Sequence, residues 1–292
     1  MLKITLSVLP SIAIPILLQF GPADPSTVAY RHDPSLLVYD FNLHLGPVGN
    51  VDLVKSLGFE GLVTSVQVPA DLTKLSQYAG YVQTIPGFDL LAFVNYDFTN
   101  PASSQVWRDA LPVLASVEAP LWVILKGAPS ASALAQLLAQ MATESQAAGV
   151  QTVIYPHWNT DIESAAEASA LISAIGHPNL KNSLHTCHEI RAGNQYTLDA
   201  VVSQHAQVSA LVTIAGAEAD AYAGPFDPLI GWSDAIMPLD KGHFSLLPFL
   251  QELHDSGYDG PVILHTFGIT ENRGHLQASL SEYAEYLEQL TP

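Results

Sequence analysis

From residue 36 onward, short apolar runs rich in β-branched and aromatic residues alternate with amphipathic stretches of helical periodicity. This alternation is typical of a parallel sheet whose strands are joined by crossover helices. We expect eight strands, at 36–43, 61–67, 88–95, 120–126, 151–156, 180–188, 209–215 and 261–267. Eight strand–helix units in about 250 residues are the size of a TIM barrel. The sequence therefore predicts an α/β fold, a single (β/α)8 TIM barrel over residues 36–292.

The connections between these strands have helical periodicity that is clearest at 130–148 and 246–255. Gly149 and Gly257 stand where these two helices should stop. The connection at 216–244 is longer than the others, and we expect it to be a functional loop or lid, with a padding insertion as the alternative. A doubly wound sheet is the alternative architecture, but no Gly-rich phosphate-binding turn follows the first strand.

The N-terminus has the pattern of a secretory signal peptide over residues 1–23, followed by a linker at 24–35. Its apolar run at 4–20 is interrupted by Pro10 and Pro15, whereas about 20 uninterrupted apolar residues are needed to span a bilayer. We therefore expect export to the periplasm or the extracellular space, with no stable membrane insertion after cleavage. The alternatives are an uncleaved anchor, or a misassigned start and a cytoplasmic protein.

The chain is strongly acidic: Lys and Arg number 10 against 28 Asp and Glu, which gives a formal charge of −18. The basic residues are scattered singly, whereas a nucleic-acid partner requires clustered Lys and Arg on its surface. We therefore expect no nucleic-acid partner. The single cysteine, Cys187, excludes an intrachain disulfide and a Cys-rich metal site, and we interpret it as a buried barrel residue.

Histidines gather where the predicted strands end, which is where TIM barrel enzymes place their chemistry. These are His44, His157, His185, His188 and His265. Imidazole suits both proton transfer near neutral pH and the binding of metals such as Zn or Mn. Strand alternation would point His185 and His188 to opposite sides, so we expect at most one to face the barrel axis and favour His188.

Other polar and aromatic residues lie at the same predicted edge of the sheet. We expect Lys126 or Lys241 to stabilise a developing enolate oxygen, with solvated rim lysines as the alternative. The residues that we expect to bind substrate are Asn42, Asn95, Trp158, Glu189, Asp240 and His265.

Several of these segments resemble the sugar phosphate isomerase/epimerase family of the xylose-isomerase-like TIM barrel superfamily. They are Tyr155-Pro156-His157-Trp158, Thr186-Cys187-His188-Glu189, 213–217, 237–242 and Gly257-Tyr258-Asp259-Gly260-Pro261. The resemblance implies proton transfer α to a carbonyl and a divalent metal held by two glutamates, an aspartate and a histidine. The chain departs from this pattern, because Tyr155 or Pro156 and His265 stand where two glutamates would be. His157 and His188 match histidines of a metal-poor branch.

The combined expectation is an isomerase, epimerase or lyase acting on a small carbohydrate, with His157 and His188 as general acid and base. An unphosphorylated sugar or keto-sugar fits best, since phosphate recognition favours Arg, and the scattered basic residues disfavour the endonuclease activity found elsewhere in the superfamily. No cofactor is certain. One alternative is a sugar isomerase with Zn or Mn held by His157, His188 and His265, or by displaced ligands among Glu189, Glu218 and Asp240. Another is a non-catalytic exported sugar-binding barrel.

Overall fold

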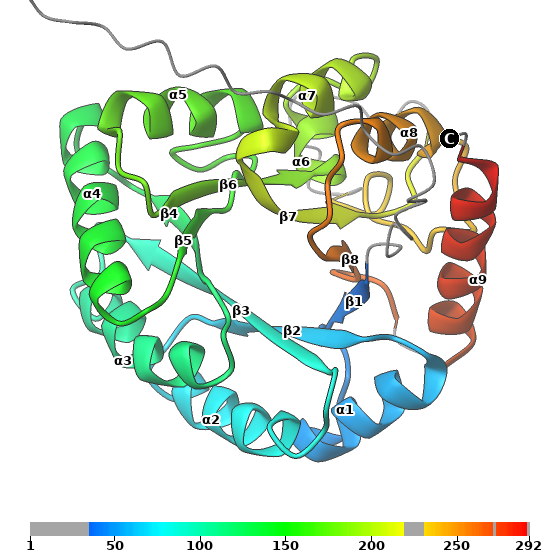
Figure 1. The fold of residues 1–292 in the computed structure, drawn as a ribbon, viewed down its shortest axis with the longest axis horizontal. Helices are drawn as coiled ribbons and strands as arrows, with labels where there is room; N and C mark the ends of the chain where they lie inside the picture. Colours follow the sequence, from blue (N-terminus) through cyan, green and yellow to red (C-terminus); the bar gives the residue numbers. More distant parts are fainter. Residues whose placement is uncertain (1–34, 219–230, 271–272, 291–292) are drawn as a thin grey trace, which may run out of the picture. The chain divides into compact units, whose positions relative to one another are not determined.

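The computed structural model describes residues 35–218, 231–270 and 273–290. Within these ranges, eight parallel strands close into a barrel in chain order, which confirms the predicted TIM barrel (Figure 1). The strands are β1 (Leu36–Tyr39), β2 (Gly61–Val66), β3 (Asp89–Asp97), β4 (Leu121–Lys126), β5 (Thr152–Ile154), β6 (Leu180–His185), β7 (Ser209–Ile214) and β8 (Val262–Leu264).

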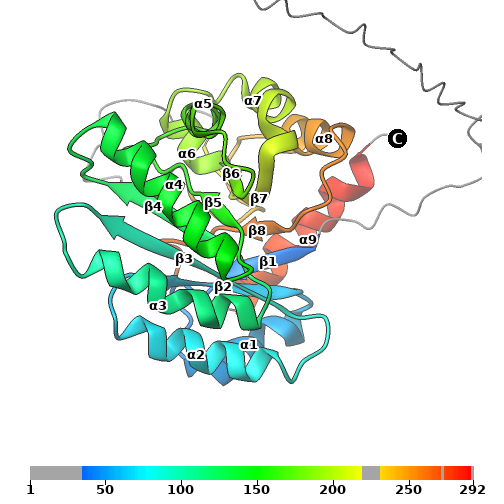
Figure 2. The ribbon, with the colours of Figure 1, turned by 60° about the vertical axis from the view of Figure 1, so that its left-hand side comes forward.

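Helices surround this barrel on the outside (Figures 1 and 2). They are α1 (Gly46–Leu57), α2 (Asp71–Val82), α3 (Ser103–Ser116), α4 (Ala131–Ala147), α5 (Ala165–Ile175), α6 (Thr186–Arg191), α7 (Leu198–His205), the 3-10 turn η1 (Ala206–Val208), α8 (Leu247–Asp255) and α9 (Arg273–Gln289). The helices predicted at 130–148 and 246–255 are confirmed as α4 and α8. None of the described helices is both long and apolar enough to cross a membrane.

Some predictions concern residues that the structure does not describe. The expected signal peptide at 1–23 and the linker up to residue 34 lie outside the described residues, so cleavage and export stay predictions. The long connection after β7 is described at 215–218 and 231–246, where Gly216 and Met237 form an antiparallel bridge.

The interior of the barrel is filled with stacked aromatic rings. Trp122 and Tyr155 stack with centroids 4.5 Å apart, and the Trp122 indole N–H donates to Ser183 Oγ at 2.9 Å. Tyr39 and Phe93 meet edge to face at 5.9 Å. TIM barrel interiors are packed layers of side chains. Here the layer below the carboxyl ends of the strands consists largely of packed aromatic rings.

The end of β6 differs from the prediction. A strand was expected over 180–188, but pairing with β7 ends at His185, and α6 begins at Thr186. The expected alternation therefore stops at His185, and the helical turn brings His188 back to the side that His185 faces. The prediction that at most one of these two histidines faces the barrel interior is wrong, since their ring centroids are 5.5 Å apart and both lie against Tyr155.

The predicted start of α4 provides a stability test. The Ser130 hydroxyl accepts a hydrogen bond from the Ala133 N–H at 3.2 Å and caps the helix. Replacing such a cap with Ala costs about 1 kcal/mol. We expect Ser130→Ala to lower the free energy of unfolding by about that amount in urea titrations. Ser132→Ala, an exposed change in the same turn, is the control, and equal losses in both variants would contradict the capping role.

Candidate active site

Four imidazoles converge at the carboxyl ends of the strands. His157 follows β5, His185 ends β6, His188 lies on α6, and His265 follows β8. The rings of His157 and His188 are 4.1 Å apart, and those of His188 and His265 are 6.2 Å apart. We call these four residues the histidine site. Parallel strand ends meet at one edge of a barrel, which explains why residues so distant in sequence lie together.

His185 forms the base of the histidine site. The Ser183 hydroxyl donates to the Ile154 carbonyl at 2.7 Å, so Ser183 Oγ accepts from His185 Nε2–H at 2.7 Å. The Thr213 hydroxyl then donates to His185 Nδ1 at 2.8 Å. The ring also stacks on Tyr155 at 3.9 Å. Both nitrogens are occupied, so His185 is a structural support and not a proton carrier.

His157 and His188 carry their protons on different nitrogens. His157 Nδ1 is 2.8 Å from the Trp158 carbonyl, which only accepts, so Nδ1 holds the proton and Nε2 has a free lone pair. The Trp158 N–H donates to His188 Nδ1 at 3.5 Å, which assigns the His188 proton to Nε2. His188 Nε2 is buried and has no hydrogen-bond partner among the described residues. The pair therefore offers one base and one acid in contact.

All four imidazoles are neutral at pH 7. Burial lowers the pKa of His157, and it lowers the pKa of His185 and His188 well below 6.5. Burial, together with the nearby His157, lowers the pKa of His265 to about 3. Among the described groups, no carboxylate opposes these shifts. A neutral imidazole can accept or donate a proton without first changing its charge, which suits general acid–base chemistry.

A cavity of about 300 Å³ opens beside His157. It is lined by Asn95, Tyr96, Ile124, Lys126, His157, Trp158, Asn159, Thr160 and Trp232. The Asn95 side-chain oxygen is buried without a hydrogen-bond partner in the described part of the chain. Lys126 lies at the rim, more than half exposed, with its Nζ 3.3 Å from Asp97. The cavity thus brings together the expected residues His157, Asn95, Trp158 and Lys126.

Lys241, Asp240 and Asn42 lie elsewhere. Lys241 is more than half exposed, its Nζ is 2.6 Å from Asp240 Oδ2, and neither residue is among those that line the cavity. The Asn42 amide is exposed and donates to the Ile269 carbonyl at 2.6 Å. The structure therefore does not bring these three residues to the cavity, because Lys241 pairs with Asp240 and Asn42 bonds to the Ile269 carbonyl.

Glu189 was expected to contact the substrate, but its carboxylate makes hydrogen bonds within the protein instead. One carboxylate oxygen accepts from the Ala165 N–H at 2.6 Å, and the other accepts from the Asn194 amide at 2.6 Å. A carboxylate is stabilising at a helix N-terminus, and Glu189 occupies this position on α5. Burial raises its pKa. Both oxygens already have partners, so the substrate contact expected of Glu189 is not supported.

Tyr155 and Tyr39 are the site residues that the sequence analysis did not assign. The Tyr39 hydroxyl donates to the Tyr155 oxygen at 3.1 Å, and that oxygen is 3.4 Å from His265 Nε2. Burial raises the pKa of both phenols well above 10, so they stay protonated. The available signal was position: Tyr155 directly precedes Pro156-His157 at the end of β5.

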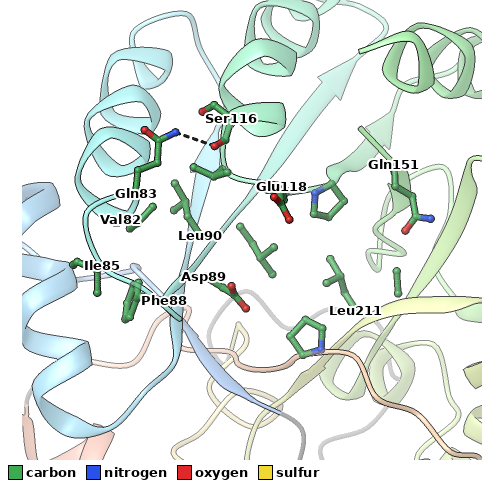
Figure 3. A pocket seen from close by; sticks show the side chains of 16 residues that line it. Val82, Gln83, Ile85, Phe88, Asp89, Leu90, Ser116, Glu118, Gln151 and Leu211 are labelled. Atoms are coloured by element: carbon green, nitrogen blue, oxygen red, sulfur yellow. Dashed lines mark hydrogen bonds between the residues drawn. The ribbon is translucent and has the colours of Figure 1, made fainter. Parts of the chain in front are cut away.

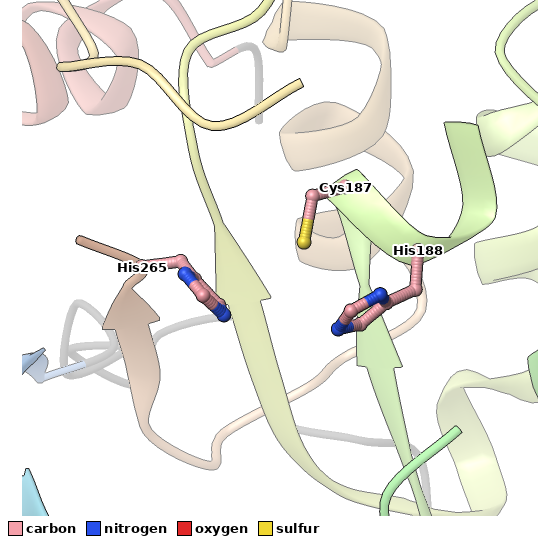
Figure 4. Close-up of side chains that lie close together, drawn as sticks. All are labelled: Cys187, His188 and His265. Atoms are coloured by element: carbon pink, nitrogen blue, oxygen red, sulfur yellow. The ribbon is translucent and has the colours of Figure 1, made fainter. Parts of the chain in front are cut away.

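The metal-dependent alternative used His157, His188 and His265, but the cluster with metal-ligand spacing among the described residues is Cys187, His188 and His265 (Figure 4). Its three ligand atoms lie within 4.8 Å of one another. The Phe267 N–H donates to His265 Nδ1 at 3.3 Å, so His265, like His188, carries its proton on Nε2. Metal ligation normally uses one nitrogen while the other donates its proton. As arranged, neither imidazole has a free lone pair, so this cluster does not fit a resident divalent metal.

A second cavity, of about 580 Å³, lies at the opposite end of the barrel (Figure 3). Its lining includes Asp89 at the start of β3, Pro120 before β4, Gln151 before β5 and Pro261 before β8. No histidine is among the described residues that line it. TIM barrel active sites lie at the carboxyl ends of the strands, so the histidine site is the candidate active site.

Comparison with known proteins identifies the fold and a family. A family model described as xylose isomerase-like TIM barrel matches residues 51–290. No sequence among curated proteins matches significantly.

Solved structures share the fold at low sequence identity. D-allulose 3-epimerase from Methylomonas sp. has a TM-score of 0.67 at 13% identity, over 87% of this chain and 98% of that one. 3-Keto-D-glucoside 4-epimerase from E. coli has a TM-score of 0.64 at 12% identity, over 88% and 100%. The IolI protein, solved with a zinc atom, has a TM-score of 0.68 at 13% identity, over 88% and 99%.

The neutral imidazoles predict a pH dependence. Their pKa is lower in the folded than in the unfolded chain, so below about pH 6.5 the unfolded chain binds protons that the folded one excludes. We therefore expect the free energy of unfolding to decrease as the pH is lowered below about 6.5. Each imidazole contributes up to about 1.4 kcal/mol per pH unit to this slope. For His265 this slope runs from pH 6.5 to about 3.

Urea titrations at several pH values measure this slope. His265→Gln should reduce the slope of the free energy of unfolding against pH by the contribution of one imidazole. The control is His44→Gln, at an exposed position outside the site, which should leave the slope unchanged. An unchanged slope in His265→Gln would mean that His265 titrates normally in the folded protein.

Proposed function

The chain belongs to the xylose isomerase-like TIM barrel family, and we propose that it is a sugar isomerase or epimerase that moves a proton α to a carbonyl. The observation that carries this proposal is the contact between His157 and His188, two neutral imidazoles whose rings are 4.1 Å apart and whose protons lie on different nitrogens. The solved structures named as sugar epimerases support the reaction class.

The proposed reaction uses the two histidines in turn. His157 Nε2 takes the proton from the carbon next to the sugar carbonyl, and the C–H bonding pair forms the new C=C bond. The carbonyl oxygen, which gains the former C=O π pair, takes the proton from His188 Nε2, so the neutral enediol lies between a protonated His157 and a deprotonated His188. In aldose–ketose isomerisation, His157 returns its proton to the neighbouring carbon, and His188 takes the hydroxyl proton from the oxygen on the first carbon, whose O–H pair forms the new C=O bond. In epimerisation, the enediol turns its opposite face to His157, which returns the proton to the same carbon, and His188 takes back its proton from the original oxygen.

The cavity beside His157 provides groups that orient a sugar. Asn95 Oδ1 has no partner and can accept a bond from a sugar hydroxyl. Trp158 and Trp232 offer aromatic surface for a sugar ring. Lys126 is the cavity-lining cation and would approach the developing enolate oxygen from the rim. We retain Lys126 in this role, and not Lys241, because of its place in the cavity.

An unphosphorylated sugar or keto-sugar is the proposed substrate. Lys126 is the single cation among the described cavity-lining residues, and it already pairs with Asp97. Phosphate recognition usually uses Arg or a helix N-terminus. Export through residues 1–23 would agree with such a substrate and is retained as a proposal, to be tested by N-terminal sequencing of the secreted protein.

Substitution of the paired histidines tests the proposal. We expect His157→Gln and His188→Gln each to lower kcat by about 10²–10⁴-fold on a sugar chosen by thermal shift, because each removes one proton carrier. His44→Gln, outside the site, is the control. A folded His157→Gln or His188→Gln enzyme with full turnover would remove that residue from the mechanism. Binding of sugars without turnover by the unsubstituted protein would favour the sugar-binding alternative.

Treatment with a chelator tests the metal alternative. We expect turnover to survive dialysis against EDTA, because proton transfer is assigned to imidazoles and the cluster at Cys187 does not fit a resident metal. The measurement is kcat before and after dialysis, with zinc and manganese content determined by elemental analysis. Loss of activity that Zn or Mn restores would establish a metal-dependent isomerase instead.

A further inference from the structure

Arg191 connects the helix that carries His188 to the loop after β7. It is the last residue of α6, one helical turn after His188, and its side chain is 5% exposed. Its guanidinium donates to the Gly231 carbonyl at 2.6 Å and pairs with the Asp234 carboxylate. These two partners flank Trp232 in the chain, so one side chain fixes the loop on both sides of that residue.

Trp232 lies between Arg191 and the reactive imidazoles. The guanidinium carbon of Arg191 is 5.4 Å from the centre of the indole. The same indole meets His188 edge to face at 5.1 Å and His157 at 5.9 Å. It also lines the cavity beside His157. A displacement of Trp232 would therefore have two effects at once: it would change a wall of the cavity, and it would expose His188.

The contacts of Arg191 are suited to holding the loop in one position. A buried Arg–carboxylate pair is costly unless its hydrogen bonds are well made, and Arg191 has a carbonyl, a carboxylate and an aromatic face around it. The planar guanidinium can serve all three at once, whereas a Lys ammonium cannot. The loop backbone adds its own support, since the Ala235 and Ile236 N–H groups both donate to the Trp232 carbonyl.

We propose that Arg191 is a positioning residue which, through Gly231 and Asp234, holds Trp232 against the His157–His188 pair, so that the indole excludes water from the imidazoles and forms the wall on which a sugar ring packs. The contact with sugar rests on the proposed function. The positioning itself does not, because it concerns the protein without substrate. Arg191 acts on the chemistry only through Trp232 and need not touch the sugar.

The barrel contains a matched cluster of the same chemistry away from the site. Arg108 on α3 pairs with Glu144 on α4 through two bonds, of 2.6 and 2.9 Å, and lies over Trp107 at 4.3 Å. Disrupting this cluster removes an Arg–carboxylate–Trp contact of the same kind without touching the mouth of the barrel. Glu144→Gln is therefore the control for Asp234→Asn.

Two measurements on the substrate-free protein test the positioning. Asp234→Asn should increase acrylamide quenching of tryptophan fluorescence, because release of Trp232 also exposes the Trp158 ring against it, while Trp107 and Trp122 stay fully buried. NMR titration of the histidine side chains should show the pKa of His188 shift upward, towards 6.5, as water reaches the ring. Arg191→Lys should give the same changes to a smaller extent, and Glu144→Gln should give neither. If Arg191→Lys does not fold, Asp234→Asn still tests the assignment by both measurements, and Trp232→Leu tests it by the titration of His188.

The outcomes separate this inference from the proposed function. An unchanged quenching constant and an unchanged His188 titration in folded Asp234→Asn would overturn the positioning role. With a sugar that is turned over, Asp234→Asn should raise KM more than it lowers kcat, and an unaltered KM would overturn the sugar-packing role of Trp232. Absence of turnover in the unsubstituted protein would instead overturn the proposed function and leave the fluorescence and NMR results standing.

Discussion

The enclosure of three buried imidazoles and the half-buried His157, without an opposing charge, is the constraint on which the site depends. A buried cationic imidazole would need a carboxylate partner, and the described site offers hydroxyls, carbonyls and aromatic rings instead. Each histidine is therefore neutral, and the backbone and side-chain contacts decide where its proton lies. The bond from His157 to the Trp158 carbonyl and the bond from the Trp158 N–H to His188 make one residue a base and its neighbour an acid. Below them, the Trp122 ring stacks on Tyr155, and Tyr155 stacks on His185.

The barrel was predictable from the sequence because eight apolar runs and their helical connections have a strong period, and α4 and α8 begin and end within one residue of the expected bounds. The convergence of His157, His188 and His265 also followed, since strand ends of a closed barrel meet at one edge. The conversion of β6 into α6 after His185 did not follow from the sequence, because no Gly, Pro or other turn residue stands between His185 and Arg191 to mark the end of the strand. That single boundary decides that both histidines of the His185–His188 segment face the interior.

Side-chain roles were harder to predict than positions. Glu189 stands beside His188 in the sequence, but its carboxylate turns to the start of α5. Lys241 lies at the expected edge, but it pairs with Asp240 and lies outside the cavity. Tyr155 was not assigned to the site from the sequence, but its protonated hydroxyl meets Tyr39 and His265. The described side chains that converge where the strands end are therefore imidazoles and phenols, whereas the resemblance led us to expect carboxylates there.

The central claim is that the His157–His188 pair moves a proton on and off carbon. The most direct measurement is incubation of the protein in D₂O with a sugar that raises its melting temperature, followed by NMR detection of deuterium at the carbon next to the carbonyl. The account predicts incorporation of deuterium by the unsubstituted protein and its loss in His157→Gln. A sugar that binds, is converted, and gains no deuterium at that carbon in either the substrate or the product would contradict proton exchange through this pair.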